Sequence, residues 1–101
     1  MTSPLIVANW KMHGDQAQCV RLTRQIVRAL SRDPVNAEVV LAPPFTSLKS
    51  AHDSLAGSKV KLAAQNCHWE IQGAYTGEIS PMMVRELGCD YVIVGHSERR
   101  H

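Results

Sequence analysis

Short apolar runs alternate with helical patterns along this chain, and this alternation limits the possible folds more than any other feature. The four strands that these runs predict begin at Leu5, Glu38, Val60 and Tyr91. The connections between them are long enough for right-handed crossovers, which join parallel strands and pack helices on the sheet. The last run, 91–94, is typical of a strand that is buried on both faces. The sequence therefore predicts an α/β fold with a parallel sheet, folded as one unit over residues 1–101.

The first helical pattern follows Asp15, which we predict to cap the N-terminus of a helix. One side of this helix is apolar, as packing on a sheet requires. The apolar positions are Cys19, Leu22, Ile26 and Leu30. The opposite side carries Arg21, Arg24, Arg28 and Arg32. Such a row could bind an anion, but we interpret it as the solvated side of an amphipathic helix.

Two further helices are predicted, each with a recognisable start. Thr46 or Ser47 is expected to cap the second helix, and Ser80 followed by Pro81 opens the third. The apolar side of the second helix consists of Leu48, Ala51 and Leu55. Glycine commonly ends a helix because it adopts the left-handed conformation readily. The glycines at these two ends are Gly57 and Gly88.

The segment between the third strand and the third helix, residues 65–79, shows neither helical nor strand periodicity. A loop of this length in a compact domain is usually functional or disordered. Its large apolar side chains argue against disorder. They are Trp69, Ile71, Tyr75 and Ile79. We therefore expect another surface to cover this loop.

Composition argues against several classes of partner. The formal net charge of the 101 residues is +2, which is too small to predict a nucleic-acid partner. Cys19, Cys67 and Cys89 are odd in number and widely spaced, so we expect neither a disulfide framework nor a metal site. No apolar run approaches the roughly 20 residues that span a bilayer, and the N-terminus shows no export signal. We therefore expect a reduced, cytoplasmic protein without metal, nucleic-acid or membrane partners.

Polar side chains follow three of the predicted strands at the point where each strand ends. Asn9 and Lys11 follow the first, Gln65 follows the third, and His96 and Glu98 follow the fourth. Because the carboxyl ends of parallel strands share one edge, we expect these five residues to form a rim. Lys11 could balance a phosphate or an oxyanion, and His96 with Glu98 could act as an acid-base or electrophilic pair. Each also has an ordinary interpretation as a boundary histidine or a surface charge.

Three segments match one known family in the expected order. They are Ala8-Asn9-Trp10-Lys11-Met12, Gly73-Ala74-Tyr75-Thr76-Gly77-Glu78-Ile79-Ser80 and Val94-Gly95-His96-Ser97-Glu98-Arg99-Arg100. With these segments the whole chain closely resembles the N-terminal part of the triosephosphate isomerase family. Barrels of this kind have eight strands in about 250 residues. The resemblance therefore implies about two fifths of a TIM (β/α)8 barrel, with four strands, three helices and the start of a fourth.

The resemblance implies a reaction and roles for four rim residues. The family interconverts dihydroxyacetone phosphate and glyceraldehyde 3-phosphate through an enediol or enediolate, in glycolysis and gluconeogenesis, with no metal or organic cofactor. Lys11 would bind the substrate and balance its charge, and Asn9 would help to orient it. His96 would polarise the carbonyl as a neutral imidazole, which the family keeps neutral with a helix N-terminus. Glu98 would pair with Lys11.

The resemblance also assigns the long loop to the contact between two subunits of a homodimer. Thr76 would lie at the tip of the loop, close to the partner's Asn9, the partner's Lys11 and the partner's Glu98. Tyr75 and Gly77 would lie beside it in the interface. Dimerisation would then complete each site, and it would bury apolar surface that contributes about 25 cal/mol per Å².

One part of the family's pattern is missing from the 101 residues. The family's catalytic base is a glutamate on a mobile lid loop after the sixth strand, and its phosphate is held by that loop and by those after the seventh and eighth strands. A general base typically contributes about 10²- to 10⁴-fold to a rate. We therefore expect the chain by itself to have no appreciable isomerase activity. The alternative interpretation is a standalone α/β binding or interaction module without catalysis.

Overall fold

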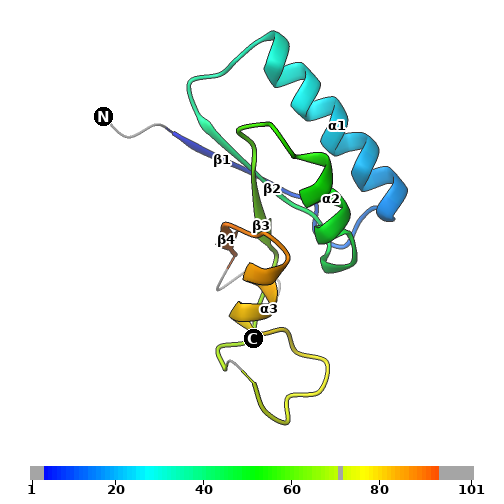
Figure 1. The fold of residues 1–101 in the computed structure, drawn as a ribbon, viewed down its shortest axis with the longest axis vertical. Coiled ribbons are helices and arrows are strands. Elements are labelled where there is room, and N and C mark those ends of the chain that lie inside the picture. Colours follow the sequence, from blue (N-terminus) through cyan, green and yellow to red (C-terminus); the bar gives the residue numbers. More distant parts are fainter. Residues whose placement is uncertain (1–3, 71, 94–101) are drawn as a thin grey trace.

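The computed structural model of this protein describes residues 4–70 and 72–93 (Figure 1). Strands and helices alternate along this part of the chain, as predicted. The strands are β1 (Leu5–Asn9), β2 (Glu38–Ala42), β3 (Lys61–Ala64) and β4 (Tyr91–Val92). The helices are α1 (Gln16–Arg32), α2 (Leu48–Ser54) and α3 (Pro81–Glu86), and a 3-10 turn, η1 (Phe45–Ser47), precedes α2. The predicted start of a fourth helix lies outside the described residues.

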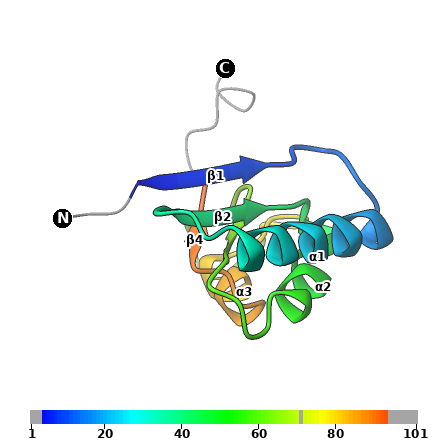
Figure 2. The same ribbon diagram turned by 90° about the horizontal axis from the view of Figure 1, so that it is seen from above.

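The strands form a parallel sheet in the order β1-β2-β3-β4. β1 pairs with β2 from Leu5 opposite Glu38 to Asn9 opposite Ala42. The helices of the described part lie on one side of this sheet (Figure 2). The predicted parallel α/β arrangement is therefore confirmed, and it brings the carboxyl ends of the strands to one edge.

The main core lies between the sheet and its helices. Leu41 of β2 and Leu62 of β3 are buried there with Leu48 of α2 and Val84 of α3. A second, smaller cluster also includes residues of β2 and β3. It consists of Val40, Ala42 and Ala63. Because successive side chains of a strand point to opposite faces, the two clusters bury β2 and β3 on both faces.

Helix α1 begins as predicted, but its buried side differs from the prediction. Asp15 Oδ1 accepts a hydrogen bond from Gln18 N, and Gln18 Oε1 accepts one from Asp15 N, each at 2.9 Å. This reciprocal pair is a capping box. Cys19 is fully buried, but Leu22 is 45% exposed and Thr23 is fully buried instead. The predicted apolar side was wrong at Leu22 because α1 packs against α2 and η1, which selects a slightly rotated face.

The starts of α2 and α3 were predicted with different success. Ser80 caps α3, since its Oγ accepts a hydrogen bond from Met83 N at 3.2 Å. Before α2, however, the chain forms η1, and Thr46 lies inside that turn. Ser47 occupies the N-cap position of α2 without a side-chain capping hydrogen bond. Its ψ of 1° is far from the extended backbone that a capping side chain needs.

The glycines predicted to end these two helices have the expected backbone conformation. Gly57 and Gly88 have φ angles of 81° and 90°, in the left-handed region that favours glycine. At Gly88 a side chain would also meet a neighbour, because a Cβ atom there would collide with the His52 ring. Gly88 is therefore required mainly by its backbone conformation, because the His52 ring is a side chain that can move aside.

The last strand is less buried than predicted. Tyr91 is 40% exposed, so the prediction of a strand buried on both faces is wrong at this position. β4 is the outermost strand of the described sheet and pairs with β3 alone. Val94, the end of the predicted apolar run, lies outside the described residues.

Candidate functional site

Three of the predicted rim residues come together at the ends of the strands. Asn9 Oδ1 accepts a hydrogen bond from Lys11 N at 2.8 Å. Gln65 Nε2 donates to Lys11 O at 2.7 Å and to Ala42 O at 2.9 Å. One side-chain amide therefore ties together the ends of β1, β2 and β3. The predicted proximity is confirmed for Asn9, Lys11 and Gln65.

Lys11 has an unusual backbone conformation. Its φ of 50° lies in the left-handed region, which few residues other than glycine adopt. The hydrogen bonds from its N–H to Asn9 and from Gln65 to its carbonyl hold this conformation on both sides. Such conformations persist where the surroundings determine them, and they cluster at functional sites. The geometry therefore favours a functional role for Lys11 over that of an ordinary surface charge.

A cavity of about 620 Å³ lies between the end of β1 and the first turns of α1. Its lining includes the cationic side chains of Lys11 and Arg21, the imidazole of His13 and the amides of Asn9 and Gln18. This volume is in the range of small-molecule sites. The charges of Lys11 and Arg21 would favour an anionic ligand.

The other two predicted site residues, His96 and Glu98, lie outside the described residues. The structure does describe how the chain approaches them. Ile93 N donates a hydrogen bond to Ala64 O at 2.9 Å, so the end of β4 lies beside the end of β3. Gln65 directly follows Ala64. The described part of β4 therefore leads to the same rim as Asn9 and Lys11.

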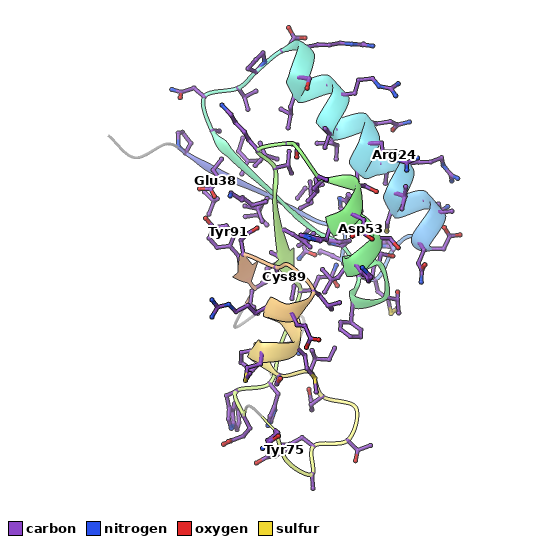
Figure 3. The ribbon with its side chains drawn as sticks, in the orientation of Figure 1. Arg24, Glu38, Asp53, Tyr75, Cys89 and Tyr91 are labelled. Atoms are coloured by element: carbon purple, nitrogen blue, oxygen red, sulfur yellow. The ribbon has the colours of Figure 1, made fainter. Side chains whose placement is uncertain are left out.

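A hydrogen bond links the two strands on either side of β3. Tyr91 Oη donates to Glu38 Oε1 at 2.7 Å, which joins β4 to β2 (Figure 3). This bond favours the neutral phenol and raises the pKa of Tyr91 above its ordinary value. Beside it, burial and then the charge of Asp90 raise the pKa of the Cys89 thiol to about 11. Cys89 is therefore a protonated thiol at neutral pH and lacks the thiolate that nucleophilic chemistry needs.

The loop between β3 and α3 has no helix or strand among its described residues, as predicted. It projects from the body of the molecule, in yellow in Figure 1. His68 N donates to Ile79 O at 2.7 Å and closes the base of the loop. The His68 ring contacts those of Trp69 and Tyr75, with centroid distances of 4.9 and 4.2 Å. The loop is therefore an arm with internal packing of its own.

A tight turn forms the tip of this arm. Glu78 N donates to Tyr75 O at 2.9 Å, with Thr76 and Gly77 between them. The φ of Gly77 is 86°, and a left-handed third residue is the signature of a type II turn. The side chains of Tyr75 and Thr76 are exposed. The residues predicted to touch a partner subunit therefore lie on a defined and accessible tip.

Neither a metal centre nor a membrane span is found in the described structure. Within residues 4–70 and 72–93, no group of three or more His, Cys, Asp and Glu side chains could hold a metal ion. In the same part of the chain, none of the helices has the length and apolar character needed to cross a bilayer.

Sequence reasoning placed Gln65 on the rim but missed what it does. Its amide joins positions that are 54 and 23 residues away along the chain. No local pattern encodes contacts at such separations. The available signal was a polar side chain directly after a buried strand, which indicates a location and not a partner.

Comparisons with known proteins agree on one family. A family model described as triosephosphate isomerase matches residues 4–101. A triosephosphate isomerase from Pelobacter propionicus is 48% identical over 100 residues, which cover 99% of this chain and 39% of that protein. One from Aquifex aeolicus is 51% identical over 100 residues, covering 96% of this chain and 39% of that protein. The chain thus spans about two fifths of the length of the curated relatives it matches.

A solved structure gives the same result for the fold. The crystal structure of triosephosphate isomerase from Bartonella henselae matches with a TM-score of 0.88 and 41% identity, over 97% of this chain and 40% of that chain. The four-stranded parallel sheet and its helices therefore correspond to the N-terminal part of a (β/α)8 barrel, as predicted. A closed barrel is not expected from four strands.

Proposed function

Because this chain belongs to the triosephosphate isomerase family, we propose that it forms the N-terminal part of an enzyme that interconverts dihydroxyacetone phosphate and glyceraldehyde 3-phosphate. The observation that carries this proposal is the tied end of β1, where Asn9 and Gln65 hold Lys11 in a left-handed conformation. Lys11 is a cationic residue whose backbone is held in place. Such a residue suits a substrate that carries a phosphate and becomes more negative at its carbonyl oxygen during the reaction.

In this reaction a proton moves between adjacent carbons of the triose. Its removal beside the carbonyl leaves an enediolate, whose negative charge lies on the former carbonyl oxygen. The ammonium group of Lys11 would stabilise this charge and bind the substrate, and Asn9 would help to orient it. A charge that is already in position lowers the barrier because no reorganisation is needed as the reaction proceeds.

His96 and Glu98 would take the remaining roles on this side of the site. His96, as a neutral imidazole, would donate a hydrogen bond to the carbonyl oxygen and then carry protons between the two oxygens. Glu98 would pair with Lys11. The position of Ile93 beside Ala64 supports this assignment, because the segment that follows β4 starts at the rim.

We further propose that the chain does not catalyse the reaction by itself. It corresponds to about 40% of the solved relative. The family's catalytic glutamate and phosphate loops belong to later strands of the barrel. Without them, this chain would lack both proton abstraction and most of the binding energy for the phosphate.

Two proteins test these proposals in one isomerase assay. The chain alone is expected to show no turnover above buffer. The chain joined to the remaining C-terminal part of the Aquifex aeolicus relative is expected to be active. In that joined protein, Lys11→Met should lower kcat/KM about 10²- to 10³-fold, and His96→Gln should lower it about 10²- to 10⁴-fold. Arg85→Gln, at an exposed position of α3, is the matched control.

Two results would contradict the assignment. Turnover by the chain alone that His96→Gln abolishes would show that the later strands are dispensable. An active joined protein that tolerates Lys11→Met would remove Lys11 from the site. A stable monomeric chain that binds a triose phosphate tightly in calorimetry would instead support a standalone binding module.

We also propose a homodimer in which the arm reaches the partner's site. The arm projects from the body, and Trp69 and Tyr75 expose apolar surface on it. Exposed apolar groups that lie together usually mark an interaction surface. Thr76, at the tip, would lie close to the partner's Asn9, the partner's Lys11 and the partner's Glu98. The dimer would then complete each site from two chains.

Sedimentation of the joined protein tests the dimer. Tyr75→Asp is expected to convert a dimer to a monomer and to reduce the isomerase activity in parallel, because a buried charge without a partner is strongly unfavourable. Glu70→Lys, another charge change on the arm, tests whether the effect is specific to Tyr75. A dimer that survives Tyr75→Asp would contradict the proposed interface.

The remaining expectations belong to the same proposal. We assign the enzyme to glycolysis and gluconeogenesis in the cytoplasm, with no metal or organic cofactor. The free thiols of Cys19, Cys67 and Cys89 suit a reducing compartment. Activity of the joined protein that persists after treatment with a strong metal chelator is the expected result.

A further inference from the structure

Positive charge is concentrated on one helix of this protein. α1 carries four of the eleven basic residues of the chain and none of its nine acidic residues. The four, Arg21, Arg24, Arg28 and Arg32, are all exposed and form what we call the arginine ridge. Arg24 points away from the body of the molecule in Figure 3. The other residues of the chain, with seven basic and nine acidic side chains, carry a net charge of −2.

The arginine ridge differs from the solvated side of an ordinary helix. Such a side usually mixes charges of both signs at spacings of three and four residues. Here Arg24, Arg28 and Arg32 follow one another at intervals of four, which places like charges side by side and destabilises the helix. None of the ridge arginines forms an ion pair with a described residue. The ridge is therefore maintained at a cost to helix stability.

We propose that the arginine ridge binds the phosphodiester backbone of single-stranded nucleic acid. At 1.5 Å per residue, Arg21 to Arg32 spans about 16 Å, within an arc of about 80° on the helix surface. A stacked strand advances about 3.4 Å per nucleotide, so the ridge covers about five phosphates. A row of charges this narrow matches the phosphate backbone of a single nucleic-acid strand. The guanidinium group can also bind a phosphate through two parallel hydrogen bonds.

Other polyanions fit this surface less well. A helix that binds a membrane surface inserts an apolar face, but α1 turns Cys19 and Thr23 into the core. An acidic peptide would need pockets for its side chains beside the charges. The exposed neighbours of the arginines include Gln25 and Ala29, which are polar or small. A backbone of repeated phosphates needs only positive charges on the surface that binds it, without such pockets.

This proposal revises the expectation from total charge. A net charge of +2 gave no reason to expect nucleic-acid binding, because it averages over the whole chain. The distribution of charge decides such binding, since basic side chains clustered on one face attract a nearby polyanion whatever the total charge of the chain. Arg24, Arg28 and Arg32 do not line the cavity at the end of β1, which only Arg21 of the ridge reaches. The proposal therefore does not depend on the isomerase reaction.

Fluorescence anisotropy with a short labelled oligouridylate and the full chain tests the proposal. Four phosphate contacts to a single strand predict a slope of about −2.8 for the logarithm of affinity against the logarithm of salt concentration. Between 50 and 200 mM salt, affinity should then fall about 50-fold. Each Arg→Gln change in the ridge should reduce the magnitude of the slope by about 0.7. The double variant Arg24→Glu with Arg28→Glu should abolish binding.

Exposed cations on the other helices provide matched controls. Lys49→Gln on α2 and Arg85→Gln on α3 remove the same charge and should leave the slope unchanged. Thermal unfolding separates binding from folding, because Arg28→Gln relieves repulsion and should not lower the melting temperature. No binding at the lowest salt, or a slope that ignores the ridge variants, would overturn the proposal. Equal affinity for polyglutamate, or for vesicles that contain phosphatidylserine, would overturn it as well.

Discussion

β1 and β2 are neighbouring strands with similar apolar sequences, yet their burial differs widely. In β2, Val40 and Leu41 are at most 1% exposed. In β1, Leu5, Ile6 and Val7 are 54%, 51% and 45% exposed. β2 has a paired strand on each side, whereas β1 is the outermost strand of the described sheet.

This difference shows that an apolar run predicts a strand but not the burial of that strand. Burial depends on what lies on both sides of the strand and on both faces of the sheet. In a closed barrel every strand has two neighbours. The exposed surface of β1 is what a longer chain of this family would cover under the proposed function, and β4 is in the same position at the other edge.

The largest expected loss of stability comes from a substitution at the centre of the sheet. Leu62→Ala in β3 should lower the free energy of unfolding by about 2–5 kcal/mol, because it leaves a cavity in the core. Leu5→Ala in β1 is the matched change at the edge and should cost about 1 kcal/mol or less, since this side chain is 54% exposed. Urea denaturation measures both. Equal costs would mean that β1 is covered in solution.

A second prediction concerns the turn that leads into β4. Gly88→Ala should cost about 1–2 kcal/mol, because alanine is strained at a φ of 90°. The nearby His52 ring is a movable side chain and should add little. Measuring Gly88→Ala in a His52→Ala background separates the two causes. If His52→Ala removes most of the cost, the collision and not the backbone strain is responsible.

A third prediction compares two serines at the starts of helices. Ser80→Ala should destabilise the chain by about 1 kcal/mol, because it removes the hydroxyl that caps α3 before β4. Ser47→Ala should change stability little or raise it, since the Ser47 hydroxyl is buried without a hydrogen-bond partner. Thermal unfolding of both variants gives the comparison. A larger loss for Ser47→Ala would contradict the assignment of the caps.

The last prediction concerns a pH dependence at the β4 edge. The pKa of Cys89 is raised to about 11 in the folded chain, from 9.0, so folding favours the neutral thiol. This contribution is fully present below pH 9 and is lost as the pH rises toward 11. Stability should therefore fall over this interval, and it should fall less in Cys89→Ala. Denaturation at several pH values measures the difference, and parallel curves for both proteins would refute it.

Local signals in the sequence predicted most of the fold. The bounds of β2 were predicted to the residue, because the prolines that follow Ala42 end the strand. The caps at Asp15 and Ser80 were also predicted correctly. These signals act over four residues or fewer. The error at Leu22 arose where the buried side of α1 depends on its contacts with α2 and η1.

The candidate site was less predictable. Its location followed from the rule that parallel strands end at one edge. The left-handed conformation of Lys11 did not follow from any pattern, because lysine rarely adopts it. The roles of His96 and Glu98 came from resemblance and stay a prediction.

The sequence by itself determined the order of the elements, the parallel sheet and the family, because these depend on periodicity, short-range caps and motifs. The tertiary structure alone decided which apolar side chains are covered and how Gln65 fixes Lys11. The physical reason is the range of the interactions. A cap joins neighbours along the chain, whereas the bond from Gln65 to Lys11 crosses 54 positions and exists only once the strands lie side by side.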